Sequence, residues 1–200
     1  MTDGVLQSCK QFKWSLVIKN IAIIGAGITG ITTAYQLKER GYNVCVFDKN
    51  RYAAMETSFA NGGQLSACNA EVWTSWSTIS KGILWMLKKD APLLFSPKMN
   101  FHKIGWLLSF ISNIPNHKQN TILTARMAIE SRDEFKRILK QEQIKLDLEE
   151  KGILHLCNNQ KSLEHGRIIN EWLAEAGLHR KEVSKKEMLT IEPTLNLQNF

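Results

Sequence analysis

The segment GAGITG at residues 25–30 constrains the fold more than any other part of the chain. It follows the apolar run IAII at residues 21–24, which predicts a short buried parallel strand, and it opens a helical pattern. In a G-x-G-x-x-G turn, the glycines allow a sharp turn, close approach of a pyrophosphate to the backbone, and close packing of helix on strand. The helix N-terminus offers unpaired N–H groups to phosphates. The pattern therefore predicts a dinucleotide-binding site.

The residues after this turn support a βαβ unit. A helix is predicted from residue 28 to about residue 40, with Gly41 as its C-cap. A second strand, NVCVFD at residues 43–48, then ends in Asp48. Asp48 lies 23 residues after Gly25, close to the spacing of about 20 for a carboxylate that binds a ribose hydroxyl. The alternative is a βαβ unit without a ligand, in which Asp48 is a solvated charge. This alternative is disfavoured because strand, helix and acid all fit.

Composition limits the classes of function. The chain has 200 residues and 44% hydrophobic residues, which indicates a globular protein of one or two domains. The net charge is +7, which suits anionic ligands or an anionic membrane surface. The basic residues are scattered and accompany no recognition motif, so nucleic acid is not an expected partner.

Cysteine usage and hydropathy give the expected compartment. The chain has four cysteines, Cys9, Cys45, Cys68 and Cys157, and none has the spacing of a metal site. Cys45 is expected to be a small core residue of the second strand. Residues 1–20 lack the apolar core of a signal peptide, and no segment reaches the length of a membrane span. We therefore expect a cytoplasmic protein, with at most a peripheral contact at the inner face of the cytoplasmic membrane.

The remaining chain predicts mainly helices. Thr57 or Ser58 is expected to cap a short helix before the turn NGGQ at residues 61–64. The other predicted helices cover residues 77–89, 101–113, 117–142, 161–176 and 184–191, and predicted strands cover residues 152–157 and 179–183. Residues 72–113 are rich in tryptophan and aliphatic residues, and burial is favoured over an interfacial membrane contact. The five histidines occur singly and predict no catalytic residue.

Five segments in this order resemble a known family. They are GAGITG, VCVFDK, ETSFANGGQLSACNAEVW, WMLKKDAPL and LTIEPTL, and the likeness covers residues 21–195. Together they resemble the N-terminal half of the small, FAD-carrying subunit of bacterial D-amino-acid dehydrogenases, within the D-amino-acid oxidase-like flavoproteins. Many flavoproteins share the glycine pattern, whereas the ETS-x-x-NGGQ and APL segments are more specific to the dehydrogenase branch.

The resemblance implies FAD as the cofactor and suggests which residues would bind it. Those around the pyrophosphate would be Ile24, Gly25, Ala26, Gly27, Ile28, Thr29 and Gly30. Asp48 would hold the adenosine ribose, with Lys49 beside it. Residues along the cofactor toward the flavin would be Ser58, Asn61, Gly62, Gly63 and Gln64.

The resemblance also implies the fold and its division. The expected fold is α/β, with a Rossmann-like FAD-binding domain and the start of an α+β substrate domain, and the C-terminal half of the family fold is missing. The expected division is an N-terminal extension at residues 1–20, the FAD-binding βαβ region at residues 21–70, and a helical segment with an incomplete substrate domain at residues 71–200. In the relatives the missing half supplies the groups that hold the substrate carboxylate, so no catalytic residue is named.

The implied reaction is oxidative deamination of a D-amino acid to a 2-oxo acid and ammonia. The electrons would pass to a respiratory acceptor. Under the leading hypothesis, the chain is a truncated or split oxidoreductase that works with a separately encoded C-terminal half. Two alternatives stay open: a catalytically inactive remnant that binds flavin, and an NAD-binding Rossmann module.

Overall fold

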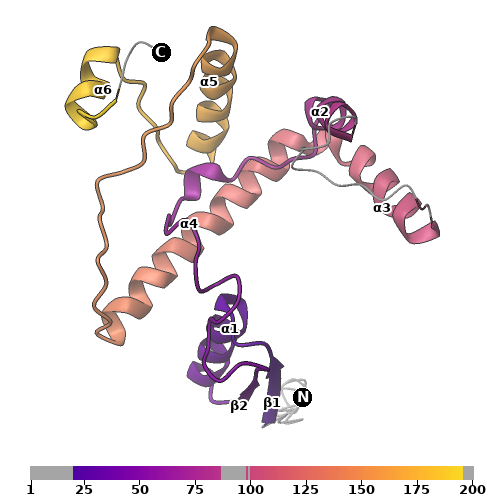
Figure 1. The fold of residues 1–200 in the computed structure, drawn as a ribbon, viewed down its shortest axis with the longest axis vertical. Coiled ribbons are helices and arrows are strands. Elements are labelled where there is room, and N and C mark those ends of the chain that lie inside the picture. The colour runs from indigo at the N-terminus through magenta and orange to yellow at the C-terminus, as the bar shows by residue number, and fades with distance from the viewer. Residues whose placement is uncertain (1–19, 87–97, 99, 196–200) are drawn as a thin grey trace, which may run out of the picture. The chain divides into compact units, whose positions relative to one another are not determined.

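The structure is a computed structural model that describes residues 20–86, 98 and 100–195. The chain divides into two compact units, residues 1–64 and residues 65–200. Figure 1 labels the helices and strands of both units. Most of the predicted N-terminal extension, residues 1–19, lies outside the described residues.

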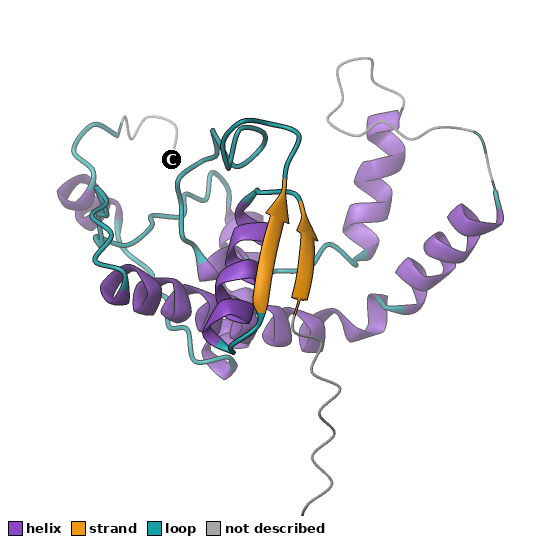
Figure 2. Ribbon diagram, turned by 90° about the horizontal axis from the view of Figure 1, so that it is seen from below, coloured by secondary structure: helices purple, strands orange, loops and turns teal. Residues whose placement is uncertain are grey.

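The first unit is a strand, a helix and a strand. β1 (Asn20–Ile24) leads into α1 (Ile28–Glu39), and β2 (Asn43–Phe47) follows. The two strands pair in parallel, with Ile21 opposite Val44, and Figure 2 shows them side by side. The predicted order and the parallel pairing are confirmed, and each boundary lies within about one residue of its prediction.

The described residues of the unit cover only one face of this two-stranded sheet. Along both strands half-buried residues alternate with exposed ones, as expected for a strand with one solvated face. Ile23 lies on the covered face, close to the first turn of α1, whereas Ile24 is 93% exposed. The predicted burial of residues 21–24 on both faces is therefore wrong here. The prediction that Cys45 is a core residue is also wrong, because its side chain is exposed on the uncovered face.

The second unit is helical in its described residues. Its elements are η2 (Ala67–Asn69), α2 (Trp76–Met86), α3 (Phe101–Ser112), η3 (Ile114–Asn116), α4 (His117–Gln141), α5 (Gln160–Glu175) and α6 (Lys185–Ile191). These five α-helices match the predicted ones to within one residue at the ends that can be compared. The last predicted turn of α2, residues 87–89, lies outside the described residues.

Three local predictions differ from the structure. Residues 152–157 and 179–183 form no strand, since no neighbouring strand pairs with either segment among the described residues. An isolated strand leaves its backbone groups unpaired, so an apolar run alone does not form one. The short helix expected after Thr57 or Ser58 is a turn instead, in which the Phe59 N–H donates to Glu56 O at 2.9 Å.

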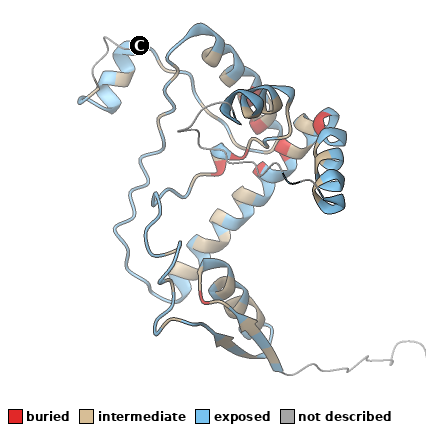
Figure 3. Cartoon of the chain, turned by 45° about the vertical axis from the view of Figure 1, so that its right-hand side comes forward, coloured by how far each residue is buried: buried red, intermediate tan, exposed pale blue. Residues whose placement is uncertain are grey.

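The core of the second unit lies where α4, α5 and η2 meet. Its buried cluster consists of Ala70, Ala125, Ile169 and Leu173, and Figure 3 marks the few buried positions of the chain. The aromatic side chains of α2 and α3 stay largely outside this core, since Trp76 is 66% exposed and Phe101 is 95% exposed. The favoured burial of these helices is therefore not found among the described residues. In the described part of the chain, none of the helices combines the length and apolarity needed to cross a bilayer.

Candidate functional site

The N-terminus of α1 presents free backbone donors. Gly25 has φ +102°, a conformation that glycine adopts readily, and its N–H donates to Phe47 O at 2.7 Å. The first helical hydrogen bond runs from the Ile31 N–H to Gly27 O at 3.0 Å. The N–H groups of residues 28–30 therefore have no acceptor within the helix, as at any helix start. They are the groups that bind phosphate oxygens in dinucleotide sites.

The Ser58 hydroxyl accepts a hydrogen bond from one of these N–H groups. The Ile28 N–H donates to Ser58 Oγ at 3.0 Å, and a Cβ on Gly27 would lie 3.3 Å from the same oxygen. The Ala54 N–H donates to Ala26 O at 2.9 Å, which ties the same loop to the glycine turn. Ser58 therefore caps α1 across 30 residues of sequence, in place of the local helix that the sequence predicts. Among the described residues, the N–H groups of Thr29 and Gly30 are left for a ligand.

Asp48 closes the other side of the glycine turn. Its Oδ2 accepts from the Ala26 N–H at 2.7 Å, and its Oδ1 accepts from the Asn50 N–H at 2.7 Å. These backbone hydrogen bonds, first that of Ala26 and then that of Asn50, hold the pKa of Asp48 below its ordinary value. Each carboxylate oxygen keeps a lone pair that can accept from a hydroxyl group. An ionised Asp48 can thus accept further hydrogen bonds from hydroxyl groups.

Lys49 pairs with a residue of the same loop. Its Nζ lies 2.7 Å from Glu56 Oε1. The hydrogen bond and charge of Glu56 raise the pKa of Lys49, and the ammonium group in turn lowers the pKa of Glu56. Both side chains are exposed, so the pair adds little to stability. It holds the loop beside Asp48.

The predicted flavin-side residues form a separate turn. Asn61 Oδ1 accepts from the Gly63 N–H at 2.8 Å, and Gly63 has φ +62°. Gly62 and Gln64 are exposed beside them. Among the described residues, no hydrogen bond joins this turn to the start of α1. The structure therefore gathers residues 25–30, Asp48 and Ser58 at one place, and leaves residues 61–64 at the end of the first unit.

This donor set fits the pyrophosphate and ribose of a dinucleotide. N–H groups without an acceptor in the helix lie at the start of α1, and a carboxylate acceptor lies at the end of the next strand, as in dinucleotide sites. A Cβ added to Gly25 would meet nothing within 4 Å, so the turn is open on its outer side. Both FAD and NAD carry these two groups.

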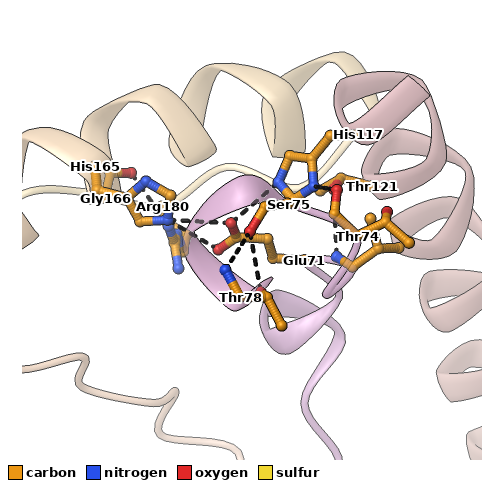
Figure 4. Close-up of polar contacts among 10 residues, drawn as sticks. Glu71, Thr74, Ser75, Thr78, His117, Thr121, His165, Gly166 and Arg180 are labelled. Atoms are coloured by element: carbon orange, nitrogen blue, oxygen red, sulfur yellow. Dashed lines mark hydrogen bonds and ion pairs between the residues drawn. The ribbon is translucent and has the colours of Figure 1, made fainter. Parts of the chain in front are cut away.

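A polar cluster in the second unit was missed by sequence reasoning. Figure 4 shows Glu71 between two histidine rings, with His117 Nε2 3.2 Å and His165 Nε2 3.1 Å from its carboxylate oxygens. His117 Nδ1 lies 3.0 Å from Thr74 O, and the ring packs edge-on against Trp172. These contacts tie the segment before α2 to α4 and α5. Their partners are 43 to 94 residues apart, so no local spacing reveals the cluster.

Most of the chain matches one known protein family. Residues 20–200 match the family described as "FAD dependent oxidoreductase", abbreviated DAO. The chain belongs to the DAO family. The family relation that the resemblance predicted is thereby confirmed, and the glycine turn of the first unit lies within the matched region.

Curated relatives of this DAO-family chain are named as dehydrogenases. The chain is 52% identical over 176 residues to D-amino acid dehydrogenase 3 of Mesorhizobium japonicum. It is 35% identical to D-amino acid dehydrogenase of Paramagnetospirillum magneticum and 31% identical to that of Dechloromonas aromatica. Each match covers 88% of this chain and 42% or 43% of the relative. The chain therefore spans less than half the length of these relatives. No solved structure matches the chain.

Replacing Asp48 by asparagine in this DAO-family chain should weaken the first unit at neutral pH. The amide oxygen can accept only one of the two N–H groups now bound. The pKa of Asp48 is lower in the folded state than its ordinary value of 3.8. Its stabilisation is therefore present above about pH 4 and is lost as the pH falls through the lowered value. Hydrogen exchange of residues 20–64 at pH 7 and pH 3 measures this stabilisation of the first unit.

The wild-type unit should lose hydrogen-exchange protection on acidification. The Asp48→Asn variant should lose less, because its protection at pH 7 is already lower than that of the wild type. The matched control is Asp147→Asn, which changes an exposed carboxylate of the second unit. Equal protection of wild type and Asp48→Asn at both pH values would contradict the role given to this carboxylate.

Proposed function

We propose that this chain is the FAD-binding part of a D-amino-acid dehydrogenase, which oxidatively deaminates D-amino acids to 2-oxo acids and ammonia. The observation that carries the proposal is the start of α1, where free N–H groups, Asp48 and Ser58 converge. The DAO family match and the names of the relatives support FAD and the D-amino acid substrate. When bound, FAD supplies the acceptor for the two electrons removed from the α-carbon.

The chain's own residues have binding and orienting roles in this proposal. The N–H groups of Thr29 and Gly30 would hold the pyrophosphate, where the helix dipole favours negative charge. Asp48 would accept hydrogen bonds from the adenosine ribose while Ala26 and Asn50 fix its carboxylate. The exposed turn of residues 61–64 would lie along the cofactor toward the flavin. Its glycines leave the backbone open to close approach.

The proposed partners follow from the same relation. They are a D-amino acid, a respiratory electron acceptor and the C-terminal half of the family fold. We place the assembly in the cytoplasm, at the inner face of the cytoplasmic membrane. The exposed aromatic side chains of α2 and α3 and the net charge of +7 support this placement.

The visible absorption spectrum tests the proposal. The chain is incubated with FAD and passed through gel filtration, alone and with the C-terminal half of a relative. A retained flavin band is expected, together with bleaching on anaerobic addition of D-alanine when both halves are present. NAD is the control ligand, since an NAD-binding module would retain NAD and not flavin. Absence of flavin with both halves folded and present would overturn the proposal.

A further inference from the structure

A thiol, a hydroxyl and an imidazole meet in the second unit, outside the dinucleotide site. Cys68 lies on η2, and its Sγ is 3.0 Å from Nε2 of His155. Ser66 Oγ lies 2.9 Å from the same sulfur. Cys68 and His155 are 87 residues apart in sequence, so the fold alone brings them together.

The side chain of Cys68 contacts the core of the second unit and is partly exposed to solvent. Its side chain packs against the buried cluster of α4 and α5 and is half-buried. His155 is exposed, so both side chains keep surface that solvent can reach. A nucleophile within hydrogen-bond distance of a base is the arrangement that activates thiols in enzymes.

His155 is held in the form that can accept a proton. Partial desolvation of the ring, although the residue as a whole is exposed, and, second, the positive charge of Arg180 lower the pKa of His155. Its ring therefore stays neutral to a lower pH than an ordinary histidine. Arg180 is itself fixed by Gly166 O, to which its Nη2 donates at 3.3 Å. The positive charge of Arg180 beside His155 also favours anionic reagents.

We propose that Cys68 is a modification site at which the thiol exchanges with a small disulfide that carries carboxylates, with His155 as the proton acceptor. The thiol proton moves to His155 Nε2 as Cys68 Sγ attacks one sulfur of the disulfide. An Sγ–S bond forms and the S–S bond of the reagent breaks. The departing thiolate takes the proton from His155. The products are a mixed disulfide on Cys68 and one free thiol, so no further oxidant is needed.

The test compares two single-thiol versions of the full chain, one keeping Cys68 and one keeping Cys45. Cys45 is the matched control, because it is more exposed than Cys68 and its thiol has no hydrogen-bond partner among the described residues. Dithiobis(nitrobenzoate) is the probe, and the rate of thiol release is measured at neutral pH. We expect Cys68 to react about tenfold faster, since an ordinary thiol is only a few per cent ionised at pH 7. Equal or slower reaction of Cys68 would overturn the proposal.

A second measurement separates proton transfer from packing. In the version that keeps only Cys68, the rate of thiol release should stay high at pH values below the usual titration range of histidine. In His155→Gln the rate should be about tenfold lower at neutral pH and fall steadily on acidification, as for an ordinary thiol. An unchanged rate and pH profile in His155→Gln would reduce the pair to a packing contact. If His155→Gln fails to fold, the pH profile of the unaltered pair and the comparison with Cys45 decide the matter.

Discussion

Replacing Gly30 by alanine is expected to disrupt the first unit and abolish the flavin binding proposed for it. A Cβ at this position would lie 1.9 Å from Gly25 O, 3.0 Å from Gly25 C and 3.5 Å from Ile23 Cγ2. The first two are backbone atoms of the turn, which cannot move aside as a flexible side chain can. Helix α1 must then separate from β1, and the donors at its start lose their position relative to Asp48.

The expected loss of stability is opposite to the usual effect of replacing glycine by alanine inside a helix. Alanine inside a helix is favoured over glycine by about 1 kcal/mol, whereas overpacking a close contact costs about 1–3 kcal/mol and occasionally more. For a contact this short we expect a net loss of about 3 kcal/mol, a large part of the stability of a small unit. Hydrogen exchange of residues 20–47 measures the loss, and gel filtration with FAD measures flavin retention.

Gly105→Ala is the matched control for Gly30→Ala. Gly105 also lies within a helix, α3, but a Cβ there would meet nothing within 4 Å. This variant should keep flavin binding and gain up to about 1 kcal/mol in the second unit. Wild-type protection and flavin retention in Gly30→Ala would show that the helix does not approach the turn as closely as the structure has it.

Replacing Leu173 by alanine is expected to destabilise the second unit by about 2–5 kcal/mol. Its side chain is 0% exposed and lies in the buried cluster with Ala70, Ala125 and Ile169. Two members of this cluster are already alanines, so little neighbouring side chain is available to fill the cavity. The truncation therefore removes a large share of the apolar contact between α4 and α5.

Urea unfolding followed by circular dichroism measures this loss. Ile168→Ala is the matched control, because it truncates another aliphatic residue of α5, whose side chain is 47% exposed. Its effect should stay within about 1 kcal/mol. Similar unfolding midpoints for the two variants would contradict the placement of the core at Leu173.

Local patterns predicted the elements of this chain well. The apolar run before the glycines, the helical period after residue 28 and the second run at residue 43 gave the βαβ unit with its boundaries. Such patterns work because strand and helix periods repeat within a few residues. The failed strands at residues 152–157 and 179–183 had apolar residues but no partner strand among the described residues. Strand formation depends on a neighbour that the local sequence does not specify.

The sequence by itself determined the glycine turn, the acid after the second strand and the order of the helices, since each is a short-range pattern. Tertiary structure decided the rest. It placed Ser58 on the Ile28 N–H, Asp48 on the Ala26 N–H and Cys68 beside His155, pairs separated by 30, 22 and 87 residues. Serine, aspartate and cysteine each form many kinds of hydrogen bond, so their identity does not name a partner. Only the packing of the elements brings one donor and one acceptor within 3 Å.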